Sequence, residues 1–416
     1  MSIITTITAH EIIDSRGNPT IQTTITLASG AHATASVPSG ASTGIHEALE
    51  LRDHDAHRYN GLGVLRAVEQ SEGIIRDHIV GIEHDQRSLD QALIELDHTP
   101  NKSQLGANAI LGVSLAFARA VAQERAIPLY TYLGSLSSPA LPAQIPQPMF
   151  NIINGGKHAD SGLDIQEYMI GPVGFPTIRE KIRVASEIIT ALKKILVSKG
   201  YSIGVGDEGG FAPQLSKNEE ALDLIVSAIT AAGYTTDQVR IGIDAAASSF
   251  YTDGAYNLRI DGVVRSLTST ELIDWYESLV LQYPIISIED GLAEEDWQGF
   301  TTLTERLGNR ITIIGDDLLV TNVLRIQQAI DTHAVNAVLI KPNQIGTLSE
   351  TLDAIMLSKH HGWIPFISHR SGETTDTFIA DLAVGLACPF IKAGSLARGE
   401  RVCKYNRLME IETELY

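Results

Sequence analysis

The sequence predicts an α/β protein in which a smaller α+β domain precedes a C-terminal β/α barrel of the TIM type. Three features support this prediction. The C-terminal half holds a near-regular series of apolar runs that each end on a charged or imidazole side chain, residues 3–37 alternate apolar and polar side chains, and residues 130–147 concentrate proline, serine and glycine. A chain of 416 residues is long for one compact domain but suits a barrel with a companion.

The N-terminal domain is expected at residues 1–130. Its alternating segment at 3–37 has turn signals at DSRGNP and ASG, which predict a three-stranded antiparallel meander. The small, turn-forming residues of VPSGASTG follow and predict a loop. Apolar residues then recur at helical spacing, so we expect helices around 61–79, around 84–97 and in the stretch GANAILGVSLAFARAVAQERA.

The barrel domain is expected at residues 131–416. Its apolar runs end, in chain order, at Asp244, Glu289, Asp316, Lys341, His369 and Lys392. The intervals leave room for a loop, a helix and the next strand, which favours parallel strands whose ends share one rim. The polar stretch YTDGAYNLRIDG, after Asp244, is typical of an inserted hairpin. Helices are expected near 176–199, 271–282 and 347–361.

The composition excludes several classes of protein. Lysine and arginine number 31 against 50 aspartates and glutamates, a formal net charge of −19, which argues against nucleic acid as a partner. The two cysteines, Cys388 and Cys403, lack metal-type spacing, so we expect neither a disulfide framework nor a zinc site. No apolar stretch is long enough to span a membrane and the start MSIITTITAH is unlike a secretory signal. We therefore expect a cytoplasmic protein, with an additional cell-surface location left open.

Three carboxylates at strand ends, Asp244, Glu289 and Asp316, form a pattern that suits a hard divalent cation. Carboxylates gathered at one mouth repel one another unless a cation or raised pKa values relieve the repulsion. Magnesium is the leading interpretation. The alternative is that each carboxylate forms a separate salt bridge to a neighbouring loop.

Lys341 follows an apolar strand and could act as a general base if nearby positive charge disfavours its ammonium form. The alternative is an ordinary solvated strand end. In GVGDEGGFAP, Asp207 and Glu208 stand among glycines that could bring a carboxylate close to a ligand, although GDEGG is also a plausible turn.

Two further motifs supply polar groups. INGGKHAD and DIQEYMI contribute His158, Gln166 and Glu167 near the start of the barrel, where a lone histidine could equally be structural. SHRSGET supplies His369, Arg370 and Ser371 before a helical pattern, an arrangement that could hold a phosphate group or simply cap the helix.

These motifs together resemble the enolase family, the phosphopyruvate hydratases of glycolysis. The resemblance extends over essentially the whole chain. It rests on EIIDSRGNPTIQ, VPSGASTG, GANAILGVSLA, NIINGGKHAD, DIQEYMI, GDEGGFAP, SIED, GDDL, IKPNQIGTLSET, SHRSGET and IKAGSLARGERVCKYNRL. SGASTG and SHRSGET separate enolases from other members of the wider superfamily.

The resemblance implies reversible dehydration of 2-phospho-D-glycerate to phosphoenolpyruvate, in glycolysis and gluconeogenesis, with two Mg²⁺ ions per active site stabilising the enediolate. It assigns Lys341 as the base and Glu208 as the acid, with Glu167 supporting the acid, and it counts His158 among the catalytic residues. Ligands of the first magnesium would be Asp244, Glu289 and Asp316, and Ser39 would help to hold the second. The substrate-binding residues would be His158, Gln166, Glu167, Lys341, His369, Arg370, Ser371 and Lys392. A homodimer or homo-octamer is also implied.

Three positions depart from the family pattern: Lys157, Ser249 and Gly291. None is a proposed ligand or proton carrier, and Lys157 adds positive charge beside His158 in a loop expected to close over the ligand. Two other hypotheses about the function remain. One is a superfamily racemase or lyase acting on a carboxylate without phosphate, which would not need SHRSGET. The other is a binding protein built on an enolase body.

Overall fold

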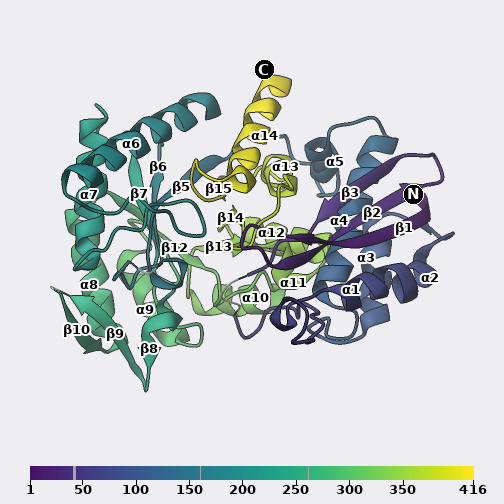
Figure 1. The fold of residues 1–416 in the computed structure, drawn as a ribbon, viewed down its shortest axis with the longest axis horizontal. Helices are drawn as coiled ribbons and strands as arrows, with labels where there is room; N and C mark the ends of the chain where they lie inside the picture. The colour runs from purple at the N-terminus through teal and green to yellow at the C-terminus, as the bar shows by residue number, and fades with distance from the viewer. Residues whose placement is uncertain (41–43, 160, 261) are drawn as a thin grey trace.

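The computed structural model describes residues 1–40, 44–159, 161–260 and 262–416 (Figure 1). The chain begins with a sheet covered by helices, continues into a closed barrel, and carries a small separate sheet. Figure 1 shows the N-terminal sheet and the small sheet β8–β10 at opposite sides of the molecule, with the barrel strands between them. The architecture is the one that the sequence predicts.

The N-terminal sheet has the strand order β3-β2-β1-β4. Its first three strands, β1 (Ser2–Ile13), β2 (Pro19–Leu27) and β3 (His32–Ser36), form the expected antiparallel meander. The sheet has one strand more than the predicted meander, because β4 (Glu83–His84) pairs with the first residues of β1. A strand of two residues shows no alternation that the sequence could reveal.

Helix α4 (Ala107–Glu124) packs against β2 and β3. It is buried on nearly every side, and small residues such as alanine and glycine recur along it, which lets neighbouring elements approach closely. The predicted helix at 61–79 is present but contains a π-helical turn between α1 and α2. The helical elements of this unit besides α4 are η1 (Tyr59–Gly61), α1 (Leu65–Gln70), η2 (Ser71–Ile75), α2 (Arg76–Ile79), α3 (Gln86–Asp97) and α5 (Leu129–Ser135).

The barrel closes in the strand order β11-β12-β13-β14-β15-β5-β6-β7. Its strands are β5 (Gln147–Asn154), β6 (Glu167–Gly171), β7 (Arg240–Asp244), β11 (Ile285–Glu289), β12 (Thr312–Gly315), β13 (Ala337–Ile340), β14 (Ile364–Ser368) and β15 (Phe390–Lys392). Neighbouring strands are parallel except around β6, which is antiparallel to both β5 and β7. The first residue of β6 therefore lies at the rim where the other strands end.

Helices surround this barrel on its outer side. They are α6 (Ile178–Ser198), α7 (Asn218–Ala231), α8 (Ser269–Gln282), α9 (Trp297–Leu307), α10 (Val323–Thr332), α11 (Pro342–Ile345), α12 (Leu348–His360), α13 (Phe378–Gly385) and α14 (Gly399–Leu415). Two short 3₁₀ turns, η3 (Gly156–His158) and η4 (Ala247–Phe250), follow β5 and β7. The expected helices near 176–199, 271–282 and 347–361 correspond to α6, α8 and α12.

The expected hairpin after Asp244 is a three-stranded sheet of β8 (Tyr251–Thr252), β9 (Ala255–Ile260) and β10 (Val263–Leu267). Asp253 and Gly254 connect β8 to β9 with φ values of 53° and 82°. Two successive residues of positive φ form the tight turn that a twisted hairpin requires, which explains the Asp-Gly pair in the sequence.

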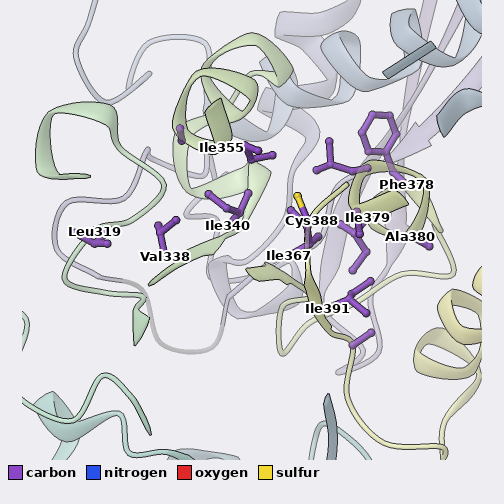
Figure 2. Packing of buried hydrophobic residues seen from close by; sticks show 14 of the residues in the cluster. Leu319, Val338, Ile340, Ile355, Ile367, Phe378, Ile379, Ala380, Cys388 and Ile391 are labelled. Carbon is purple, nitrogen blue, oxygen red and sulfur yellow. The ribbon is translucent and has the colours of Figure 1, made fainter. Parts of the chain in front are cut away.

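The buried apolar side chains of the barrel strands belong to two different hydrophobic clusters. On β13, Val338 and Ile340 belong to the large cluster that includes the surrounding helices, whereas Ala337 and Leu339 belong to a smaller one. Successive side chains of a strand point to opposite faces, so the smaller cluster fills the barrel interior. Figure 2 shows the outer cluster, in which Ile355 of α12 and Phe378, Ile379 and Ala380 of α13 lie near the strands.

Both cysteines are free, as expected, and Cys388 lies buried in this cluster. Across the described ranges, no helix combines the length and the apolar character that a membrane crossing requires.

Candidate active site

A pocket lies at the rim where the parallel barrel strands end. Most of the residues singled out in the sequence line it. Its lining consists of His158, Gln166, Glu167, Glu208, Asp244, Ala246, Asp290, Asp316, Asp317, Lys341, Ser368, His369, Arg370, Ser371 and Lys392. The folded chain thus brings side chains from widely separated motifs to one mouth, which is where barrels of this type place their chemistry.

Asp244, Glu289 and Asp316 stand at the ends of three consecutive barrel strands, β7, β11 and β12. Asp244 and Glu289 are direct partners in the strand register. Between their side chains lies the ammonium group of Lys392, whose Nζ is 2.8 and 2.9 Å from the two oxygens of Glu289 and 3.3 Å from Asp244 Oδ2. The same Nζ is 3.3 Å from Glu167 Oε1.

One ammonium therefore faces three buried carboxylates. Burial raises the pKa of Glu289, the Asp244 carboxylate raises it further, and Lys392 only partly opposes both. Burial together with the nearby Glu208 carboxylate raises the pKa of Glu167 in the same way. This group of oxygen donors is short of positive charge, and oxygen donors are the ligands that Mg²⁺ and Ca²⁺ prefer. The residues present fit a divalent cation.

The turn that carries Asp316 is held by a neighbouring acid. Asp290, which follows Glu289, adopts φ 42° and accepts the backbone N–H groups of Asp316 at 2.8 Å and Asp317 at 2.7 Å. Burial and the Asp317 carboxylate raise the pKa of Asp290 well above its ordinary value. The doubled acids in SIED and GDD thus form one structural unit.

Among the residues that the structure describes, two sets of three side chains bring possible ligand atoms to within 4.8 Å of one another. They are His158, Glu167, Glu208 and Asp290, Asp316, Asp317. The ligands expected from the sequence, Asp244, Glu289 and Asp316, correspond to neither set. In this structure Lys392 contacts Asp244 and Glu289, and Lys341 contacts Asp316. The separate salt bridges considered as an alternative are therefore present, but their cations come from the barrel itself.

Lys341 directly follows β13, and its backbone N–H donates to Thr321 Oγ1 at 2.9 Å. Its ammonium group donates to Asp316 Oδ2, and its side chain is 12% exposed. Burial works to lower the pKa of Lys341, but the Asp316 and Glu289 carboxylates oppose it, and the net shift is upward. In this state of the protein Lys341 is charged, and the contact with Asp316 is the strongest of the interactions that favour the charged form.

Glu167, Glu208 and His158 form a second cluster across the mouth. Strand β6, which begins with Glu167, is four strands from β13 in the closed barrel, so it stands opposite Lys341. His158 Nδ1 is 3.8 Å from Glu167 Oε1 and 3.6 Å from Glu208 Oε1. Glu208 Oε2 also accepts the side-chain N–H of Asn151 at 2.9 Å.

The pKa values of the two glutamates of this cluster are shifted in opposite directions. Burial raises the pKa of Glu167. Burial also acts to raise the pKa of Glu208, but the His369 and His158 rings outweigh it and hold that pKa well below its ordinary value. Burial lowers the pKa of His369 itself to about 3, so this ring is neutral at pH 7 and stabilises the Glu208 carboxylate as a dipole rather than as a cation.

Several pocket atoms have no hydrogen-bonding partner among the described residues. They are buried polar atoms of four lining residues: His158 Nδ1, Gln166 Oε1, Glu167 Oε2 and His369 Nε2. Buried polar groups are normally satisfied, and each unsatisfied one has a substantial cost. Their concentration in one pocket indicates a binding site for a polar ligand.

Arg370 and Ser371 follow β14 in the order that the sequence suggested. The guanidinium of Arg370 donates to Glu47 at 2.9 and 3.2 Å and to Asn343 Oδ1 at 3.3 Å. Glu47 belongs to the segment that follows the SGASTG loop, so it reaches the barrel rim from the N-terminal part of the chain.

Ser39 does not line the pocket but is joined to the SHRSGET loop. Its backbone N–H donates to Gly372 at 2.8 Å, and the N–H of Gly372 donates back at 2.9 Å. The Ser39 hydroxyl donates to Asp14 Oδ2 at 2.9 Å and accepts from Arg16 at 3.1 Å. Residues 41–43 of the SGASTG loop, expected to close over a ligand, lie outside the described residues, as does Asp160 of GGKHAD. Lys157 is exposed on η3.

Sequence reasoning missed four contributors: Asp290, Asp317, Glu47 and Arg401. The first two had a visible signal, since each directly follows an expected ligand at a strand end. Glu47 and Arg401 had none, because each contacts the site from an element far along the chain. Arg401 lies in the first turn of α14 and is completely buried.

Comparison with known protein families adds an independent finding. A family model described as the N-terminal domain of enolase matches residues 4–133. A second, described as the C-terminal TIM barrel domain of enolase, matches residues 142–416. Together they extend over nearly the whole chain, in the order and with the fold found here. The chain therefore belongs to the enolase family.

Proposed function

We propose that this protein catalyses the reversible dehydration of 2-phospho-D-glycerate to phosphoenolpyruvate. The observation that carries the proposal is the placement of Lys341 across the barrel mouth from the pair Glu167 and Glu208. Removing a proton from one carbon and a hydroxyl from the next requires a base and an acid on different sides of one small substrate. This pocket offers both.

Lys341 is the proposed base. The proton on carbon 2 is very weakly acidic, because its removal adds a second negative charge beside the substrate carboxylate. Lys341 can accept that proton only in its neutral form. Burial favours the neutral form, and the carboxylate of Asp316, joined by the weaker effect of Glu289, opposes it. Anything that withdraws the charge of Asp316 from Lys341 therefore prepares the base.

The proposed metal ligands are Asp244, Glu289 and Asp316 for one Mg²⁺ and Ser39 for a second. When bound, these ions supply positive charge against the charge that develops on the substrate carboxylate. The shortage of positive charge around Glu289 supports the first assignment. For the second, the structure offers Ser39 held against Asp14 and Gly372.

Glu208 is the proposed acid that assists departure of the carbon-3 hydroxyl as water, with support from Glu167. The pKa of Glu167 is raised and that of Glu208 is lowered, so when the two neighbouring side chains share one proton, Glu167 is favoured to carry it. Transfer of this proton to Glu208 gives the acid form that the reaction needs. His158, close to both, can serve that transfer.

The other lining residues would hold the substrate. Arg370 and Ser371 are proposed for the phosphate group, since a guanidinium matches phosphate oxygens with paired donors. Lys392 is proposed for the substrate carboxylate. Gln166 and His369 complete the polar lining, and both carry a buried atom that a ligand could satisfy.

The direct test is to mix the purified protein with Mg²⁺ and 2-phosphoglycerate and to follow the ultraviolet absorbance of the enol product. A rise in absorbance that depends on Mg²⁺ is expected. A flat trace at every metal concentration, from protein shown to be folded, would reject the proposal. Testing carboxylate substrates without phosphate in parallel distinguishes a related racemase or lyase.

A further inference from the structure

Arg401 makes an unusual set of contacts for a buried cation. Its guanidinium donates to His369 Nδ1 at 2.6 Å and to the backbone carbonyls of Arg370 at 2.6 Å, Ser371 at 2.6 Å and Asp207 at 3.2 Å. Its side chain is 0% exposed. The closest carboxylate oxygen, on Glu400, is 3.6 Å from Nε. The charge is therefore held by carbonyl dipoles and one imidazole.

These contacts connect two loops of the candidate active site. Asp207 precedes the proposed acid Glu208, and residues 369–371 carry the proposed phosphate cradle. The packing beside the guanidinium is close, because a Cβ at Gly394 would lie 2.9 Å from both Arg401 Cδ and the backbone oxygen of Glu208. Arg401 thus fixes the relative positions of groups that the reaction would use together.

The contact with His369 has a chemical consequence. A guanidinium has only donors, so His369 Nδ1 must act as the acceptor and carry no proton. A neutral imidazole then bears its proton on Nε2. That atom is 3.3 Å from Glu208 Oε2. Nε2 makes no hydrogen bond to Glu208 in this structure, but the atom of His369 that lies near Glu208 is an N–H group and not a basic nitrogen.

We propose that Arg401 is a positioning residue that holds His369 in the neutral tautomer with its proton on Nε2. In this form His369 has no free lone pair facing Glu208, so it cannot remove the proton that Glu208 must deliver to the leaving hydroxyl. The charged groups around His369 are Glu208, Arg401 and Lys392. Among these three groups, Glu208 favours the imidazolium, while burial and the two cations oppose it.

The catalytic meaning of this inference rests on the proposed function, but the tautomer can be measured without turnover. Protein labelled with ¹⁵N-histidine is examined by long-range ¹H–¹⁵N correlation spectra from about pH 5 to about pH 8, the range in which an unperturbed histidine titrates. The His369 signals are assigned by their loss in His369→Gln. We expect one tautomer, protonated on Nε2, throughout this range. A proton on Nδ1, or titration inside the range, in the wild-type protein would overturn the proposal.

Substitutions then test the role of the guanidinium. Arg401→Lys keeps a donor and should keep the tautomer, whereas Arg401→Leu should release Nδ1 and let His369 titrate or populate both tautomers. An unchanged tautomer in folded Arg401→Leu contradicts the proposal. If that variant does not fold, the wild-type spectrum still tests the proposal, because it shows which nitrogen of His369 carries the proton. Arg407→Lys is the matched control, because Arg407 lies on the same helix but pairs with Asp381, and its His369 spectrum should match wild type.

Activity provides a second readout with a different signature. A variant in which His369 titrates should lose turnover mainly on the acid side of its pH profile, by about 10-fold, while a purely structural defect lowers turnover equally at every pH. If His369 is protonated on Nε2 but the protein does not act on 2-phosphoglycerate, the proposed function is wrong and the proposed role of Arg401 is retained. If the protein is active but His369 is protonated on Nδ1, the role of Arg401 is wrong and the proposed function is retained.

Discussion

Replacing Lys392 with methionine should destabilise the protein in a way that depends on pH. Methionine keeps much of the volume but removes the ammonium that faces Glu167, Asp244 and Glu289, whose side chains are 1 to 4% exposed. Breaking a buried ion pair by removing one partner typically costs about 3–5 kcal/mol. Protonation of a carboxylate limits this cost, because a neutral carboxyl group tolerates burial.

The limit can be calculated for Glu289, whose ordinary pKa is 4.5. Holding such a group protonated at pH 7 costs about 3.4 kcal/mol, and the cost falls by about 1.4 kcal/mol for each unit of decreasing pH. A raised folded-state pKa means that the associated stability is complete below pH 4.5 and is lost as pH rises through the folded pKa. The pKa of Glu289 is already raised with Lys392 present, so the deficit of Lys392→Met is only the additional cost of holding Glu289 protonated, near zero at pH 4.5 and at most about 3 kcal/mol at pH 7.

Denaturation monitored by circular dichroism at several pH values measures this deficit. For a chain of 416 residues that unfolds as one unit, about 3 kcal/mol corresponds to a fall in Tm of roughly 3–4 °C. Added Mg²⁺ should reduce the deficit, since it offers the carboxylates another cation. Lys404→Met is the matched control: Lys404 is equally buried but faces one carboxylate, Glu373, and two carbonyls, so Mg²⁺ should not restore it. A deficit that is constant with pH would show that lost packing, and not lost charge, is responsible.

Three further outcomes follow from the same structure. Lys341→Ala should lower turnover by roughly 10²–10⁴-fold while calorimetry shows Mg²⁺ binding largely intact, and unchanged turnover would place the base elsewhere. Gly372→Ala should cost about 1–3 kcal/mol of unfolding free energy, because its Cβ would lie 2.4 Å from Asp14 Oδ2. Gly73→Ala is the control and should cost nothing, because open space surrounds Gly73. Equal stabilities of the two variants would refute the steric argument. Asp90→Asn should be tolerated at pH 8 and be about 1 kcal/mol more stable than wild type there. Burial raises the pKa of Asp90, so the wild-type protein loses stability as pH rises above 3.8, whereas the variant does not. If the stability of the variant relative to wild type were lower at pH 8 than at pH 4, this reasoning would be wrong.

The barrel could be predicted because each of its buried strands ends in a visible break of pattern. Apolar runs that stop at Glu289, Asp316, Lys341 and Lys392 are strands whose ends meet at one rim. Periodicity gives the position of a strand but not its direction. The reversal of β6 was therefore not foreseen, and its functional side chain, Glu167, stands at the start of the strand rather than at the end.

The candidate site was predicted only in part for a related reason. Local sequence shows which residues stand at the rim, but it does not show which cation each carboxylate contacts. The Lys392 contacts with Glu289 and Asp244 join strands that are far apart in the barrel order, and the Glu47 contact with Arg370 joins two different structural units. Such pairs depend on how the folded elements meet, which no short motif records.

Stability and chemistry are coupled in this pocket, and the coupling decides which variants are informative. Lys392 holds three buried carboxylates, so its removal changes the fold's electrostatics and the proposed substrate contact at once. Lys341 contacts one carboxylate, Asp316, at the more exposed edge of the pocket. A loss of turnover in a Lys341 variant can therefore be attributed to the chemical step with a simple stability control. The same loss in a Lys392 variant is interpretable only beside its stability measured across pH.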